Sequence, residues 1–133
     1  MERILLAYDG GEPARRALET AAELALAFHA SLSVVSVVPL DRDGRPVEPW
    51  DGGEAHAREL HEAKRLLADH GLEVDLLEPL GDPAPTIERI AVEGGFDTIV
   101  VGSRRLRALD RMVGDSISEH VVTHTSATVV VTH

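Results

Sequence analysis

The chain has 133 residues, a formal net charge of −10 and no cysteine, and only 3% of its residues are aromatic. Its length suits a single domain, and the missing thiols exclude disulfides and cysteine chemistry. The acidic balance disfavours nucleic acid as a partner, and no apolar run approaches the roughly 20 residues of a membrane-spanning helix. We therefore expect no nucleic-acid or membrane partner and a cytoplasmic location.

Strands and helices are predicted to alternate along the whole chain. Short runs rich in valine and isoleucine indicate strands, and apolar residues at intervals of three and four indicate helices. Because aromatic residues are few, the core must be built mainly from Val, Ile, Leu and Ala. In chain order the predicted elements are a strand at 4–8, a helix at 13–28, a strand at 32–38, a helix at 54–70, a strand at 73–77, a helix from 83 closed by Gly94 and Gly95, a strand at 98–101, a helix from 116 and a strand at 127–132.

One segment has a different composition from the rest. Residues 39–53 are rich in proline, glycine and charged side chains and contain the only tryptophan, Trp50. Such clusters mark loops rather than regular elements. We expect a polar loop here and consider it a candidate mobile segment.

The alternating order predicts the fold class. It is typical of an α/β protein with a single-domain, open and mostly parallel five-stranded sheet, covered by helices on both faces in the Rossmann-like manner. We expect residues 1–133 to form this one domain. In such sheets, ligands bind beyond the carboxyl ends of the strands, where the strand order reverses. Two strand ends carry glycine and polar residues together, at Asp9–Gly11 and at Gly102–Ser103.

The segment that follows residue 101 has the features of an anion site. Gly102 permits close approach of its backbone to a ligand, and the Ser116–Glu119 capping box places the N–H groups of a helix start nearby. Four arginines lie between these two features, at Arg104, Arg105, Arg107 and Arg111. An equally simple interpretation is a strand end, a capped helix and a solvated loop, so the residues alone leave both readings open.

The same segments resemble the universal stress protein family, and the resemblance covers the whole chain. The family is known for a glycine, two residues, a second glycine, nine residues and then glycine followed by serine or threonine. The matching segments, in family order, are Ala7–Gly10 with the Glu12–Pro13 helix start, Gly81–Ala84, Phe96–Arg104, Ser116–Val122 and Ala127–Val131.

The resemblance implies an adenine-nucleotide site and assigns residues to it. Asp9 and a backbone group of Val37 would hold the adenosine part. The phosphates would be bound by the glycine loop and the hydroxyls after it, which correspond to Gly102, Ser103, Ser116 and Ser118. The implied ligand is ATP or another adenine nucleotide with Mg²⁺.

The chain departs from the family pattern at two positions. In an ungapped match Arg105 occupies the place of the second glycine and Asp115 that of the third, whereas a shifted match lets Gly114 serve as the third. Arg105 would either close the cradle with its side chain or hold a phosphate with its guanidinium. A chain that binds no nucleotide therefore stays open, as a decayed site on a homodimeric protein-interaction module.

No pattern in the sequence indicates an enzyme or a metal site. Ser103 has no His–Asp partner in a recognisable motif, and His120 and His124 lack a third ligand. A slow nucleotide hydrolase would have only Asp9 and Asp115 as candidate groups. The family resemblance implies a non-catalytic, stress-response regulatory protein and a homodimer paired through the last strand, residues 127–131.

Overall fold

The computed structural model describes residues 1–38, 52–102 and 126–132. Within these ranges it contains five strands and three helices in alternating order. The elements are β1 (Arg3–Ala7), α1 (Glu12–Phe28), β2 (Ser31–Val35), α2 (Gly52–Asp69), β3 (Asp75–Leu77), α3 (Pro83–Glu93), β4 (Thr98–Gly102) and β5 (Thr128–Thr132).

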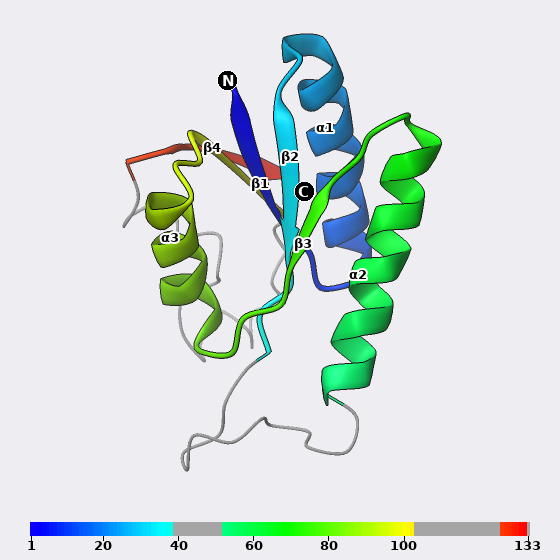
Figure 1. The fold of residues 1–133 in the computed structure, drawn as a ribbon, viewed down its shortest axis with the longest axis vertical. Helices are drawn as coiled ribbons and strands as arrows, with labels where there is room; N and C mark the ends of the chain where they lie inside the picture. The colour runs from blue at the N-terminus through cyan, green and yellow to red at the C-terminus, as the bar shows by residue number, and fades with distance from the viewer. Residues whose placement is uncertain (39–51, 103–125, 133) are drawn as a thin grey trace, which may run out of the picture.

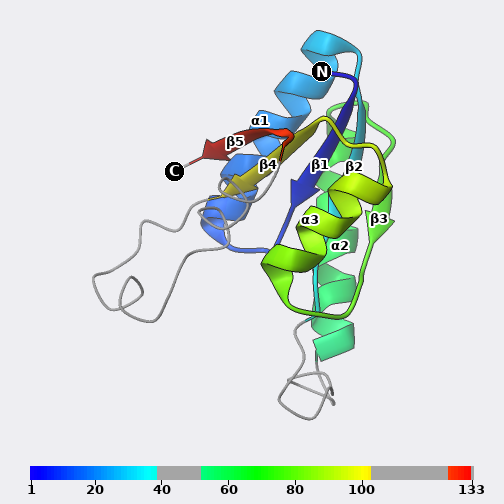
Figure 2. The same ribbon diagram turned by 90° about the vertical axis from the view of Figure 1, so that its left-hand side faces the viewer.

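All five strands pair in parallel in one sheet, in the order β3-β2-β1-β4-β5. The central strand β1 aligns Leu6 with Val34 of β2 and with Val100 of β4. Figure 1 shows α1 and α2 on one side of this sheet and α3 on the other. In Figure 2 the face of the sheet that α3 covers is turned toward the viewer. The predicted fold class, an open parallel sheet with helices on both faces, is confirmed.

Alternating side chains of each strand supply the two halves of the core. On β1, Ile4 and Leu6 are fully buried against α1 and α2, whereas Leu5 is fully buried on the side of α3. This alternation follows from the two-residue period of a strand, and burial on both faces explains why β1 and β4 are nearly continuous apolar runs. Among the described residues, the core consists of Val, Ile, Leu and Ala with two aromatic exceptions, Tyr8 and Phe96.

Three predicted boundaries were wrong by two or three residues. The predicted strand at 32–38 ends at Val35, because beyond it Val38 forms only an isolated bridge with Leu80. The strand predicted at 73–77 is reduced to Asp75–Leu77. The loop predicted at 39–53 is shorter at its end, since α2 begins at Gly52 despite two consecutive glycines, which are poor helix formers.

Several predicted features lie outside the described residues. These are most of the loop at 39–53, the arginine-rich segment and the helix predicted from residue 116. In the described part of the chain, no helix has the length and apolar character needed to cross a membrane.

Candidate functional site

The two predicted strand ends lie side by side at one edge of the sheet. The chain passes from β1 through α1 to β2 and β3 on one side, and β4 then returns to the opposite side of β1. The strand order therefore reverses between β1 and β4, the place where open parallel sheets bind ligands. Asp9 follows β1 and Gly102 ends β4, so the structure brings together these two residues, which are 93 positions apart.

Asp9 is held in a tight turn between β1 and α1. Its Oδ1 accepts a hydrogen bond from the Gly11 N–H at 3.0 Å, and Gly10 between them has a φ of +79°, which favours glycine. The turn leads into α1, whose first turn contains Pro13. Asp9 is exposed at the carboxyl edge of the sheet.

Val37 lies just beyond β2, between two residues that bond toward the β3 side. The N–H groups of Ser36 and Val38 donate to Leu77 O at 3.0 Å and Pro79 O at 2.8 Å. Because backbone groups alternate along an extended segment, those of Val37 face the opposite side, toward the end of β1. No residue in the described ranges forms a backbone hydrogen bond with the N–H or C=O of Val37.

In the described ranges, the backbone groups of Val37 have no partner on β1, because β1 ends earlier than the extended segment that follows β2. The last bond between them joins the Tyr8 N–H to Val35 O at 2.9 Å, after which the chain turns at Asp9. The side chain of Val37 is partly buried against the α3 half of the core, so its backbone is held in place. The N–H donor and C=O acceptor of Val37 thus lie at the same carboxyl edge of the sheet as Asp9.

Gly102 is a glycine for a reason that the sequence did not reveal. A Cβ atom at this position would lie 2.4 Å from Pro13 O and 2.9 Å from Ala14 N, so the first turn of α1 occupies the space of a side chain. The close approach expected for a ligand is thus made by the backbone of α1. Gly102 remains at the predicted edge, but its lack of a side chain is explained by packing.

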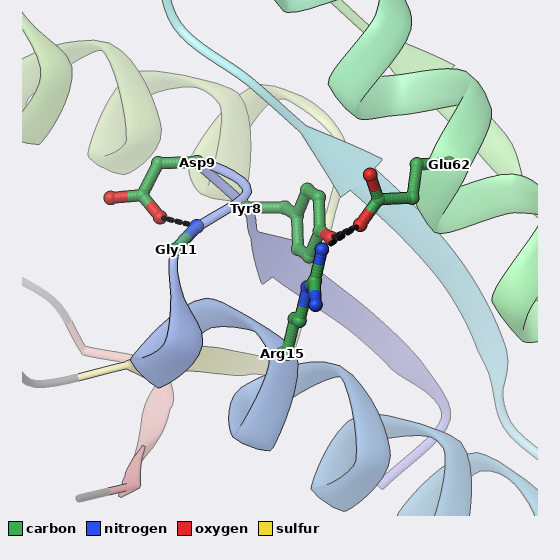
Figure 3. A network of polar contacts seen from close by, with 5 residues as sticks. All are labelled: Tyr8, Asp9, Gly11, Arg15 and Glu62. Carbon is green, nitrogen blue, oxygen red and sulfur yellow. Dashed lines mark hydrogen bonds and ion pairs between the residues drawn. The ribbon is translucent and has the colours of Figure 1, made fainter.

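A polar network beside this edge was missed by sequence analysis. The Tyr8 hydroxyl donates to Glu62 Oε1 at 2.9 Å, and the Arg15 guanidinium donates to the same oxygen at 3.0 Å, which joins β1, α1 and α2 (Figure 3). Burial and the adjacent Glu62 carboxylate raise the pKa of Tyr8 to about 12, so the hydroxyl stays protonated. A tyrosine in an otherwise aliphatic strand was the one available signal.

The phosphate side of the predicted site falls outside the described residues. This applies to Ser103, Arg105, Gly114, Ser116 and Ser118, and also to the alternative position Asp115. In the described ranges, no group of three or more His, Asp or Glu side chains is placed to hold a metal ion. The described half of the site is therefore built from Asp9, Val37 and Gly102.

Known proteins similar to this chain were identified by sequence and by structure. Universal stress protein Sll1654 of Synechocystis is 30% identical over 121 residues, which covers 90% of this chain and 77% of the relative. A solved protein from the universal stress protein family of Burkholderia pseudomallei is 30% identical, with a TM-score of 0.78 and coverage of 98% and 94%. The Archaeoglobus fulgidus universal stress protein, solved in complex with dAMP, shares the fold at 21% identity, with a TM-score of 0.78 and coverage of 100% and 98%.

A model of the universal stress protein family matches residues 1–133, the full length of the sequence. That match agrees with the fold similarity and mutual coverage of the solved family protein. The resemblance drawn from sequence motifs is confirmed, and the chain belongs to the universal stress protein family.

Proposed function

We propose that this chain is a non-catalytic regulatory protein of the stress response that binds an adenine nucleotide at the carboxyl ends of β1 and β4. The observation that carries the proposal is the pair of backbone groups at Val37, which have no backbone partner in the described ranges and stand beside the Asp9 turn. We further propose that residues 1–133 act as one cytoplasmic domain.

The chemistry of adenosine suits these groups. Adenine carries an amino donor next to ring-nitrogen acceptors, and a residue that offers both an N–H and a C=O can bond to both. The Asp9 carboxylate can accept hydrogen bonds from ribose hydroxyls while it keeps its bond from Gly11. The complex of the Archaeoglobus fulgidus relative with dAMP supports an adenine nucleotide as the ligand class.

The phosphates would extend from Asp9 toward the end of β4 and the residues after it. We propose that Gly102, Ser103, Ser116 and Ser118 bind them, with Arg105 and Gly114 in the connecting segment. Mg²⁺ would accompany a polyphosphate, since Asp115 adds a negative charge to this side.

The first test measures binding of adenine nucleotides to the purified chain. We expect AMP, and ATP with Mg²⁺, to raise the melting temperature, because a ligand that binds only the folded state stabilises it. Small molecules released by denaturing freshly purified protein would identify a nucleotide retained from the cell. No bound nucleotide and no shift with any adenine nucleotide would contradict the proposal.

The second test addresses the N–H of Val37. Val37→Pro should weaken AMP binding about tenfold, which corresponds to the loss of one hydrogen bond of about 1.4 kcal/mol. The matched variant Val37→Ala keeps the N–H and should bind AMP within about twofold of the wild type. Circular dichroism and melting temperature verify that both variants fold. Equal affinity of the Pro and Ala variants would contradict the role given to Val37.

Asp9 has a matched pair of substitutions as well. Asp9→Asn keeps an oxygen that can accept from Gly11, so the turn is preserved while the charge is lost. Asp9→Ala loses both the bond from Gly11 and the charge. We expect Asp9→Ala to bind AMP more weakly than Asp9→Asn, and affinity unchanged in both variants would remove Asp9 from the site.

The second candidate function is a homodimeric protein-interaction module without nucleotide, and one observation favours it. In the described ranges β5 is bonded to β4 on one side only, and its Val129, Val130 and Val131 stay partly exposed. An apolar edge strand is prone to pair with another strand. We propose a homodimer through residues 127–131, which sedimentation at micromolar concentration tests. A monomer at that concentration would contradict it.

A further inference from the structure

Tyr8 is a buried polar residue that directly follows the central strand β1, immediately before the Asp9 turn. It is 3% exposed, and its N–H donates to Val35 O at 2.9 Å. Its hydroxyl reaches between two helices to Glu62 of α2, where Arg15 of α1 donates to the same oxygen. A phenol held at its backbone and at its tip cannot move without breaking one of these bonds.

Asp9 is bonded covalently to this fixed residue and points the opposite way. Figure 3 shows the Tyr8 ring directed toward Glu62 and the Asp9 carboxylate directed away from it, toward Gly11. The orientation of the peptide between the two residues therefore determines where the carboxylate lies. Tyr8 thus connects this peptide to α2, and Asp9 connects it to the candidate site.

The α2 helix makes a second contact with the same turn. A Cβ atom at Gly10 would lie 3.0 Å from Glu59 Cγ, so the Glu59 side chain packs directly over the turn. Glu59 and Glu62 are three residues apart and share one face of α2. Helix α2 thus rests on the β1–α1 connection at two neighbouring points, of which the hydroxyl of Tyr8 holds one.

We propose that Tyr8, acting through Glu62 and Arg15, is a positioning residue for the Asp9 turn and thereby sets the affinity of the site for the adenosine part of a nucleotide. The first half of this inference concerns the protein alone, and the second half rests on the proposed function. Neither Tyr8 nor Glu62 contacts the ligand in this proposal. Both act by fixing the carboxylate of Asp9.

The network persists under ordinary conditions. The raised pKa of Tyr8 keeps the hydroxyl protonated as a donor well above neutral pH. Glu62 is about one-third exposed and Arg15 more than half exposed, so their ion pair by itself contributes little. The bond from the buried hydroxyl is therefore the contact to remove.

The experiment compares wild type with Tyr8→Phe, which deletes one oxygen and keeps the ring. The first measurement is the exchange rate of the Gly11 amide by NMR in protein without nucleotide. We expect this rate to rise about fivefold, which corresponds to one weakened hydrogen bond, while amides of β4 keep their rates. The second measurement is AMP affinity by calorimetry, which should fall about fivefold.

Substitutions at the protein surface provide the controls. Glu62→Ala removes the acceptor of the hydroxyl at a partly exposed residue and leaves the buried ring of Tyr8 unchanged. It should also speed Gly11 exchange and weaken AMP binding. Glu62→Gln keeps an oxygen that accepts from the hydroxyl, so its Gly11 exchange rate and its AMP affinity should both stay near those of the wild type. Arg15→Gln should have a small effect, and Arg16→Gln, whose partner Glu12 lies outside the network, should have none.

The outcomes separate the two halves of the inference. An unchanged Gly11 exchange rate in Tyr8→Phe and Glu62→Ala would overturn the positioning role, whether or not nucleotide binds. A faster rate with unchanged AMP affinity would overturn its link to the ligand. A wild-type chain that fails to bind AMP would contradict the proposed function, and the exchange rates would still decide whether Tyr8 holds the turn.

Discussion

The two ends of the sheet are built from the same strands, yet they differ in how their polar groups are used. At the amino end, Asp97 Oδ2 accepts the N–H groups of Glu2 at 2.7 Å and Arg3 at 3.2 Å, and Asp97 Oδ1 accepts the Thr98 hydroxyl at 2.7 Å. The Arg3 side chain donates to Gly94 O at 2.9 Å and stacks on the Phe96 ring. The protein itself satisfies these groups.

The carboxyl end has a different arrangement. Val37 presents backbone groups that no backbone group in the described ranges bonds, and Asp9 is exposed beside it. The contact of Gly102 with the first turn of α1 closes part of this edge. The comparison indicates that side chains of the protein secure the amino end of the sheet. At the carboxyl end, the N–H and C=O of Val37 have no backbone partner in the described ranges.

The largest effect on this comparison is expected from Gly102→Ala. Its Cβ would lie 2.4 Å from Pro13 O, so either α1 or β4 must move, and overpacking of this kind costs about 3 kcal/mol. Urea denaturation measures the change in the free energy of unfolding. Gly71→Ala is the control, because nothing lies within 4 Å and only its φ of +80° adds strain, of about 1 kcal/mol. Equal stability of Gly102→Ala and wild type would show that α1 does not limit this position.

An intermediate effect on the free energy of unfolding is expected at high pH, where the Tyr8 hydroxyl ionises. Its pKa is about 12 in the folded chain against 10.0 as the ordinary value, so its stabilising contribution is complete below pH 10 and is lost as the pH rises toward 12. The loss should be on the order of 2 kcal/mol. Tyr8→Phe should lack this component when unfolding is followed from pH 9 to 12. Parallel curves for the two proteins would contradict the prediction.

The smallest effect is expected from Asp97→Ala, at the end of the sheet opposite the site. Because Asp97 is exposed, the loss of its bonds should cost only about 1 kcal/mol at neutral pH. Hydrogen bonds from the Glu2 N–H and the Thr98 hydroxyl lower the pKa of Asp97 below 3.8, so its contribution is present above that value and lost as the pH falls through the folded pKa. The stability difference between variant and wild type should therefore narrow below about pH 4.

Asp97→Ala also sharpens the comparison of the two ends. AMP affinity should stay within about twofold of the wild type, because the substitution is at the far edge of the sheet. A larger loss of affinity would mean that the two ends are coupled, and the separation drawn between them would fail.

The sequence by itself determined the fold class, the order of elements and the two strand ends that meet at the site. These are local properties, since the spacing of apolar residues identifies each element and Asp9–Gly11 and Gly102 mark where β1 and β4 stop. The family motifs have the same character, because each is a short run of residues. The error at the end of β2 arose because β1 ends earlier, so that tertiary pairing overrides the local preference for a strand there.

Only the tertiary structure revealed the strand order, the packing that requires a glycine at position 102, and the hydrogen-bond network at Tyr8. The contact of Gly102 with Pro13 spans 89 positions and the bond from Tyr8 to Glu62 spans 54, and neither leaves a periodic signal in the sequence. Such contacts exist because the crossover helices bring distant segments to one edge of the sheet. The sequence therefore located the strand ends of the site, and the packing of α1 and α2 against them determined how those ends are held.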